Sequence, residues 1–177
     1  MIRTESFDSL AAGGESDDRP HTITMVIESS SARETKAWGR RLALLLQGGE
    51  LIGLSGELGA GKTCFIKGLA RGLRLREEDI LSPTFTMIQE HRGRVPFYHI
   101  DLYRLDSPEL DDLGLRDYLF SSGVAAVEWF ERLHTVPALS CLAIKITFAG
   151  ANRRTLELSA DSARYAALIE QLKSRFI

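Results

Sequence analysis

The sequence contains few cysteines and no long apolar segment, and both absences restrict the class of protein. The two cysteines, Cys64 and Cys141, lie far apart and form no CxxC pair, so neither a disulfide framework nor a zinc knuckle is indicated. No apolar run approaches the roughly 18–20 residues that a membrane-spanning helix needs. The first residues also lack the apolar core of a signal peptide. We therefore expect a reduced, cytoplasmic protein without a membrane segment.

An excess of charge of either sign is absent as well. Lys and Arg number 22 and Asp and Glu number 24, which gives a net charge of −2 at neutral pH. We therefore do not expect the chain to bind nucleic acid through a positive field over its whole surface. Binding through a local basic patch is still consistent with this charge. Apolar residues make up 44% and charged residues 26%, the balance of a soluble globular protein.

The chain divides into a short polar start and one domain. Residues 1–21 are rich in Gly, Ser, Asp and Glu without apolar periodicity, so we expect a disordered tail there. In residues 22–177, short apolar runs alternate with helical patterns, which indicates a single α/β domain with a largely parallel sheet. Polar turns at 91–94 and 150–152 predict two hairpins, so the sheet should be mixed.

Two helices carry start signals. A Ser-x-x-Glu capping box begins at Ser31, and the glycine pair 48–49 is expected to end that helix. Ser107 and Pro108 have the types expected at the cap and first position of another helix.

Residues 56–63, GELGAGKT, match the G-x-x-x-x-G-K-T pattern of a phosphate-binding loop. Glycines allow consecutive backbone N–H groups to wrap around phosphate oxygens, and the following helix presents its positive end to them. In this pattern Lys62 reaches the β- and γ-phosphates, and the Thr63 hydroxyl is a ligand of Mg²⁺. We therefore predict a P-loop NTPase-type three-layer sandwich with a mixed, mainly parallel sheet. The nucleotide should contact Glu57, Leu58, Gly59, Ala60, Gly61, Lys62, Thr63 and Cys64.

Two acidic residues follow apolar strands after the loop. Asp101 ends the run 97–100, and Glu128 ends the run 124–127. Because ligands bind at the carboxyl ends of parallel strands, both carboxylates are candidates for the acid that holds Mg²⁺ directly or through water. No N/T-K-x-D tetrapeptide, the guanine-reading element of GTPases of this architecture, occurs in the chain, so ATP is favoured.

The segment 82–86, SPTFT, lies in chain order between the loop helix and Asp101. This is the position of a switch segment, in which a hydroxyl meets the γ-phosphate and Mg²⁺. A polar turn with a rigid proline is the simpler interpretation. Arg104 is a candidate for stabilising charge on a transferring phosphate, although a packing role is the default for it.

Five segments occur in an order and spacing that is far more specific than the loop alone. They are residues 56–63, 82–86, 99–105 (HIDLYRL), 113–118 (LGLRDY) and 127–129 (VEW). Together they resemble the bacterial TsaE (YjeE-type) ATPase family, which supports threonylcarbamoyladenosine modification of tRNA. The resemblance covers about residues 25–160. Cys64 stands where a second Thr is usual and Phe130 where Pro is common, and neither departure removes a charged or ligating group.

The resemblance also implies roles for individual residues. Lys62 and Thr63 would bind phosphate and Mg²⁺, and Thr84 or Thr86 would supply the switch hydroxyl. Asp101 would be the Walker-B-like acid, and Glu128 an Mg²⁺-binding or catalytic acid. Trp129 would lie next to the nucleotide. The implied cofactors are ATP and Mg²⁺. The implied partners are a TsaD-type transferase and its TsaB-type partner protein, which modify the adenosine next to the anticodon of tRNAs that read A-starting codons. With no clear arginine finger, we expect hydrolysis to be slow alone and stimulated by the partners, and contact with tRNA to be indirect.

Two other functions are consistent with the loop. A small-molecule kinase shares it on a chain of this size, but needs a second pocket with lid arginines, and the arginines here are scattered. A nucleotide-sensing scaffold, whose hydrolysis is incidental, is the alternative outside the enzymes.

Overall fold

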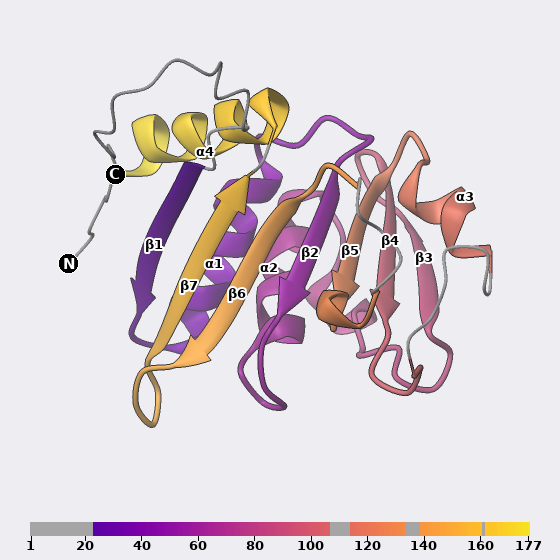
Figure 1. Cartoon of the computed structure of the whole chain (residues 1–177), viewed down its shortest axis with the longest axis horizontal. Helices are drawn as coiled ribbons and strands as arrows, with labels where there is room; N and C mark the ends of the chain where they lie inside the picture. Colours follow the sequence, from indigo (N-terminus) through magenta and orange to yellow (C-terminus); the bar gives the residue numbers. More distant parts are fainter. Residues whose placement is uncertain (1–22, 107–113, 134–138, 161) are drawn as a thin grey trace, which may run out of the picture.

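The computed structural model describes residues 23–106, 114–133, 139–160 and 162–177, so the expected tail and the helix start at 107–108 lie outside the described residues. The described residues form a seven-stranded sheet in the order β1-β7-β6-β2-β5-β4-β3 (Figure 1). The strands are β1 (Ile23–Ser29), β2 (Leu51–Ser55), β3 (Ile88–Arg92), β4 (Pro96–Asp101), β5 (Val124–Glu128), β6 (Leu142–Phe148) and β7 (Arg154–Ala160).

The sheet is mixed, as predicted. The four central strands, β6, β2, β5 and β4, pair in parallel. The two predicted hairpins, β3–β4 and β6–β7, are antiparallel, and β1 adds an antiparallel edge strand beside β7. Three of the six pairings are therefore parallel, and all three are confined to the centre of the sheet, where the glycine-rich loop follows β2.

Local sequence signals account for the start of the first helix, but not for its end. The capping residue of α1 (Ala32–Ala43) is Ser31, whose Oγ accepts a hydrogen bond from the Glu34 backbone N–H at 3.2 Å. The Glu34 carboxylate returns to the backbone N–H of Ser30 at 2.7 Å, one residue before the position expected in a capping box. The helix ends at Ala43, so the prediction that the glycine pair 48–49 ends it is wrong; those glycines take positive φ in the next turn. The helices are α1 (Ala32–Ala43), α2 (Lys62–Gly72), α3 (Leu115–Leu119) and α4 (Ala163–Phe176), with short 3₁₀ turns η1 (Glu77–Asp79) and η3 (Phe130–Arg132).

The two faces of the sheet are covered unequally. Helices α1 and α2 pack together behind the sheet, and α4 lies across the end of β1 and β7 (Figure 1). These three helices share the larger hydrophobic core with the strands. The other face carries a smaller core that α3 and η3 cover over β2, β5 and β4. Within the described ranges, the third layer of the predicted sandwich therefore covers only this part of the sheet. None of the helices in the described ranges is long and apolar enough to cross a membrane.

The topology brings the ends of three strands to one edge of the molecule. Strands β2, β5 and β4 run in parallel, and in their register Asp101 stands opposite Glu128, while Glu128 stands opposite Leu54. The loop that follows β2 begins one residue beyond its end at Ser55. Thr63 and Glu128, which are 65 positions apart in the sequence, therefore meet at this edge.

Candidate functional site

The loop between β2 and α2 has a backbone that only glycines adopt readily. Gly56, Gly59 and Gly61 have φ of +135°, +77° and +115°. At Gly56 a side chain is also excluded by space, because a Cβ there would lie 2.2 Å from the Ile146 carbonyl oxygen of β6. The loop therefore packs closely on β6 and leads into the N-terminus of α2 at Lys62.

Lys62 is almost completely buried, with 4% of its surface exposed. Its ammonium donates hydrogen bonds to the carbonyls of Gly56 at 2.6 Å and Glu57 at 2.9 Å. The same Nζ lies 3.7 Å from the centroid of the Trp129 ring, a cation–π contact. Burial lowers the pKa of Lys62, and the charges of Glu128, Glu131 and Asp101 oppose that shift. The lysine is thus held over the loop, in the position from which it can reach a phosphate.

Trp129 takes an uncommon backbone conformation for a bulky residue. Its φ of +60° lies in the left-handed region, directly after the end of β5. Its ring lies 5.0 Å from that of Tyr103, centroid to centroid. The indole thus contacts Lys62 and lines the pocket, and it also packs against the smaller hydrophobic core.

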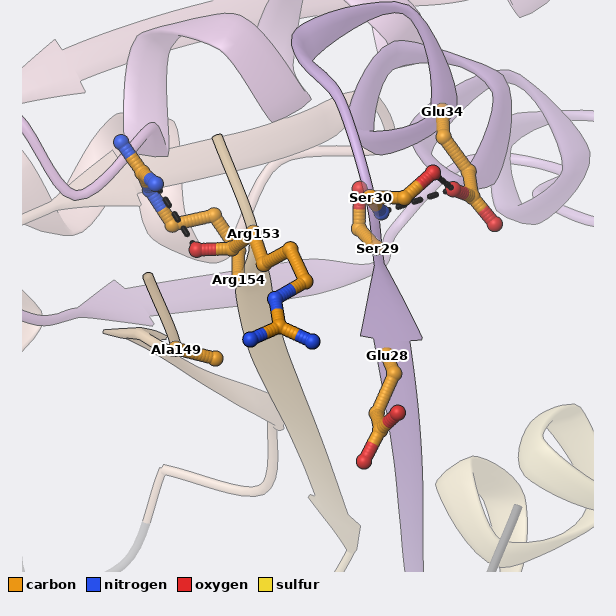
Figure 2. Close-up of a pocket in the computed structure, with 7 residues that line it drawn as sticks. All are labelled: Glu28, Ser29, Ser30, Glu34, Ala149, Arg153 and Arg154. Atoms are coloured by element: carbon orange, nitrogen blue, oxygen red, sulfur yellow. Dashed lines mark hydrogen bonds between the residues drawn. The ribbon is translucent and has the colours of Figure 1, made fainter. Parts of the chain in front are cut away.

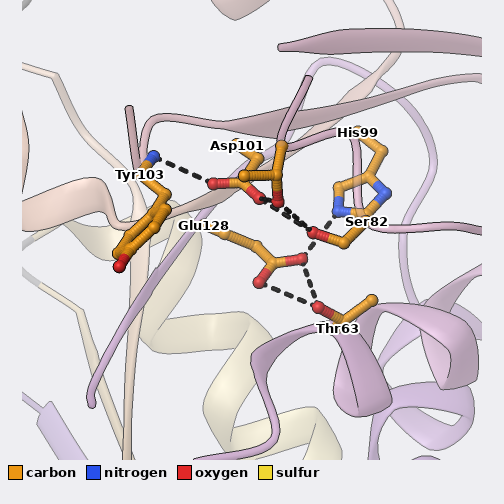
Figure 3. A network of polar contacts seen from close by, with 7 residues as sticks. Thr63, Ser82, His99, Asp101, Tyr103 and Glu128 are labelled. Carbon is orange, nitrogen blue, oxygen red and sulfur yellow. Dashed lines mark hydrogen bonds and ion pairs between the residues drawn. The ribbon is translucent and has the colours of Figure 1, made fainter. Parts of the chain in front are cut away.

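Glu128 connects the loop helix to the sheet. Its Oε1 and Oε2 accept hydrogen bonds from the Thr63 hydroxyl at 2.8 and 3.0 Å (Figure 3). On its other side, Oε1 lies 2.9 Å from Nε2 of His99, a side chain with no exposed surface. The carboxylate is itself buried, so these two polar contacts compensate for its removal from water.

Asp101 organises the segment 82–86. Its Oδ2 accepts hydrogen bonds from the Thr84 hydroxyl at 2.6 Å and the Ser82 hydroxyl at 2.9 Å. Its Oδ1 accepts one from the Tyr103 backbone N–H at 2.9 Å (Figure 3). Of the two threonines proposed for the switch, Thr84 thus contacts the acid, whereas Thr86 is exposed.

A pocket of about 290 Å³ lies between the loop, the acids and this segment. Its lining includes ten of the predicted site residues: Leu58, Gly59, Gly61, Lys62, Thr63, Cys64, Thr84, Asp101, Glu128 and Trp129. Three others do not line it, namely the exposed Glu57, the buried Ala60 and the exposed Thr86.

Three further residues belong to this arrangement but were not assigned to it from the sequence: His99, Ser82 and Tyr103. His99 precedes Asp101 by two positions on β4, so the period of two in a strand puts both on the same face. The strand period therefore indicated that His99 and Asp101 share a face, but it did not reveal that His99 contacts Glu128. Arg104 does not line the pocket, because its guanidinium lies 4.0 Å from the centroid of the exposed Phe85 ring.

The oxygen atoms at this edge suit a hard divalent cation. The described residues contain no cluster of three or more His, Cys, Asp or Glu side chains arranged to hold a metal ion. Mg²⁺ does not need such a cluster, because it is usually bound by one or two protein oxygens together with phosphates and waters. The hydroxyl of Thr63 and the carboxylate of Glu128 are side by side at 2.8 Å and provide ligands of this kind.

The fold and the glycine-rich loop define an α/β protein of the P-loop NTPase type. The family is shown by comparison with known proteins: the model for "Threonylcarbamoyl adenosine biosynthesis protein TsaE" matches residues 29–156, and the chain belongs to this family. The tRNA threonylcarbamoyladenosine biosynthesis protein TsaE of Bacillus subtilis is 41% identical over 140 residues, which cover 78% of this chain and 87% of the relative. The protein of the same name from Treponema pallidum is 47% identical over 106 residues, or 59% of this chain and 78% of the relative.

A solved structure agrees with this assignment. The crystal structure of Bacillus subtilis YdiB matches with a TM-score of 0.74 and 34% sequence identity. The match covers 86% of this chain and 96% of that one. The mixed α/β fold and the family resemblance inferred from the sequence are therefore confirmed, and the family role lies in threonylcarbamoyladenosine biosynthesis.

Proposed function

We propose that the chain binds ATP with Mg²⁺ and hydrolyses it, as an accessory protein for threonylcarbamoyladenosine modification of tRNA. The observation that carries the proposal is the contact of the Thr63 hydroxyl with Glu128 beside the buried ammonium of Lys62. These groups come from a glycine-rich loop and a strand end 65 positions apart. A hydroxyl, a carboxylate and a lysine gathered around such a loop match the needs of a nucleoside triphosphate with its cation.

Lys62 supplies the positive charge for the phosphates. In the described state its ammonium is satisfied by two loop carbonyls, so binding exchanges these neutral acceptors for anionic phosphate oxygens. Backbone N–H groups of the loop and the positive end of α2 add to the attraction. Bound Mg²⁺ would supply further positive charge against the charge that develops on the phosphates.

The carboxylates of Glu128 and Asp101 have different roles in the proposed site. Glu128 touches Thr63 and is in place to hold a cation directly or through water. Asp101 holds Thr84 and Ser82, and so fixes the segment that faces the end of the phosphate chain. Hydroxyls held this way can exchange the carboxylate for a γ-phosphate oxygen when the nucleotide is present.

The described lining of the pocket offers no arginine that could stabilise a transferring phosphate. None of the described residues that line the pocket is an arginine, and Arg104 stacks on Phe85 instead. P-loop enzymes gain about 10³–10⁵ in rate when such a charge is supplied in trans. We therefore propose slow hydrolysis by the chain alone and stimulation by a TsaD-type transferase with its TsaB-type partner.

The substitution Lys62→Ala tests the binding step. We expect it to weaken ATP binding by at least about tenfold, since a charge-assisted contact is lost. Lys67→Ala is the matched control, because Lys67 lies on the same helix but does not line the pocket. Isothermal titration with Mg·ATP measures both variants, and circular dichroism checks that each is folded. A folded Lys62→Ala protein that binds and hydrolyses ATP like the wild type would contradict the proposal.

A further inference from the structure

Basic side chains are concentrated on the outer sides of α1 and α2. Arg33, Lys36 and Arg40 lie three and four positions apart, so they share one side of α1. Arg71 lies in the last turn of α2, and Arg74 follows in the turn after the helix. Lys36 is partly exposed and the four arginines are exposed. The two helices lie side by side behind the sheet, so these five side chains form one surface, the basic face (Figure 1).

Three glycines bring the backbones of the two helices into contact. A Cβ on Gly39 of α1 would collide with the backbone of α2, and a Cβ on Gly68 of α2 would collide with the Lys36 carbonyl oxygen. A Cβ on Gly72 would lie 2.7 Å from the Arg40 carbonyl oxygen. Only glycine permits so close an approach. The basic side chains of the two helices are therefore held near one another.

Acidic side chains neutralise the basic face only in part. Glu77 of η1 forms ion pairs with Lys36 at 2.6 Å and with Arg71 at 3.5 Å. Glu34, the acid in the first turn of α1, is occupied elsewhere. Figure 2 shows its carboxylate accepting hydrogen bonds from Ser30, which the backbone N–H donates at 2.7 Å and the hydroxyl at 2.6 Å. The face therefore keeps an excess of positive charge.

Three guanidinium groups of this face, those of Arg33, Arg40 and Arg74, form no ion pair with any described residue. A cation near the end of a helix is favoured by the helix dipole, which accounts for Arg40. Arg33, in contrast, lies in the first turn of α1, where the dipole disfavours a cation. Arg74 has a φ of +67° at a position after the helix end that glycine usually takes. The stability of the helices therefore does not explain these arginines.

We propose that the basic face binds the phosphate backbone of tRNA directly. The family role lies in the modification of tRNA, so the chain works on a pathway whose substrate is a polyanion. Guanidinium groups bind phosphate oxygens through paired hydrogen bonds, and exposed arginines without acidic partners are available for them. The row from Arg33 to Arg40 extends about 10 Å along the helix, which reaches more than one phosphate.

This contact is separate from the nucleotide pocket, because no residue of the basic face lines that pocket. It also differs from the indirect contact with tRNA that the net charge of −2 favours. A net charge averages over the whole chain, whereas a polyanion responds to the charge of the face that it meets. Binding of this kind follows the phosphates and not the base sequence.

The test compares two double variants that lose the same charge. Arg40→Gln with Arg74→Gln removes two unpaired cations from the basic face. Lys145→Gln with Arg175→Gln removes two exposed cations, on β6 and α4, that lie outside it. Fluorescence anisotropy measures the binding of a labelled tRNA to each full-length protein at an ionic strength of about 0.15 M and above. Unlabelled polyglutamate is the competitor, and circular dichroism and titration with Mg·ATP check the fold and the nucleotide site.

We expect the wild type to bind tRNA with an affinity that falls as salt is added. The Arg40 and Arg74 variant should bind at least about tenfold more weakly, and its slope of log K against log salt should be smaller by about 1–2. The Lys145 and Arg175 variant should match the wild type. No binding of tRNA by the wild type, or equal loss in both variants, would overturn the proposal. Polyglutamate that displaces tRNA as well as unlabelled tRNA does would also overturn it, in favour of an acidic protein partner. Failure of the wild type to bind ATP while it binds tRNA would contradict the proposed function and support this contact.

Discussion

Glu128 shows how much of this site depends on one carboxylate. It accepts hydrogen bonds from Thr63 with both oxygens and contacts His99 with one of them, so it connects the loop helix to strand β4. A buried carboxylate with hydrogen bonds on two sides is held in one orientation. A cation that binds between Thr63 and Glu128 therefore meets ligands that are already positioned.

The two candidate switch hydroxyls give a matched pair of substitutions. Thr84→Ala removes the donor 2.6 Å from Asp101, whereas Thr86→Ala changes an exposed side chain that does not line the pocket. A hydrogen bond to a charged group contributes about 1.5–3 kcal/mol, so we expect Thr84→Ala to lower ATP hydrolysis by about tenfold or more. Thr86→Ala should stay within about twofold of the wild type. Single-turnover phosphate release measures both, and equal effects would show that Asp101 does not select between them.

At the scale of elements, the loop depends on glycine for its shape. Gly56→Ala places a Cβ against the Ile146 carbonyl at a φ of +135°, so we expect a loss of about 2–4 kcal/mol in the free energy of unfolding. Gly114→Ala is the control, since its φ is also positive but no atom lies within 4 Å of the added Cβ. That change should cost about 1 kcal/mol. Urea denaturation measures both, and a Gly56→Ala protein as stable as Gly114→Ala would contradict the close packing on β6.

The sequence predicted the elements whose signals are local. Short apolar runs marked the central strands, and polar turns marked both hairpins. It also predicted that Asp101 and Glu128 would both lie at the carboxyl ends of strands, where ligands bind, and the structure pairs them in register. The end of α1 was misplaced because the chain leaves the helix at Ala43 through further turns, before the glycines.

Features that depend on tertiary structure could not be read in the same way. The contact of His99 with Glu128 needs the register between β4 and β5, which no local pattern specifies. The preference for Thr84 over Thr86 beside Asp101 depends on how the segment turns after Pro83. The unequal layers follow from the strand order, which places β1 and β7 away from the smaller core that α3 and η3 cover.

For the molecule as a whole, the lack of an arginine among the described residues that line the pocket makes stimulation by a partner a specific expectation. Phosphate release by the chain should be slow alone and rise by at least about a hundredfold when the reconstituted transferase and its partner protein are added. Glu128→Gln should retain ATP binding, because Lys62 and the loop are intact, and should lose the stimulation. Matched Mg²⁺ and salt make the comparison valid. Full turnover by the chain alone, unchanged by the complex, would favour a self-sufficient enzyme such as a kinase.

The central claim is that the chemistry of this loop serves the modification of tRNA. Cells depleted of the protein and supplied with either the wild type or Lys62→Ala allow one decisive measurement, the threonylcarbamoyladenosine content of bulk tRNA. The account predicts that the modification falls on depletion, that the wild type restores it, and that Lys62→Ala at equal abundance does not. An unchanged level on depletion would contradict the role in modification, and full restoration by Lys62→Ala would contradict the need for the loop.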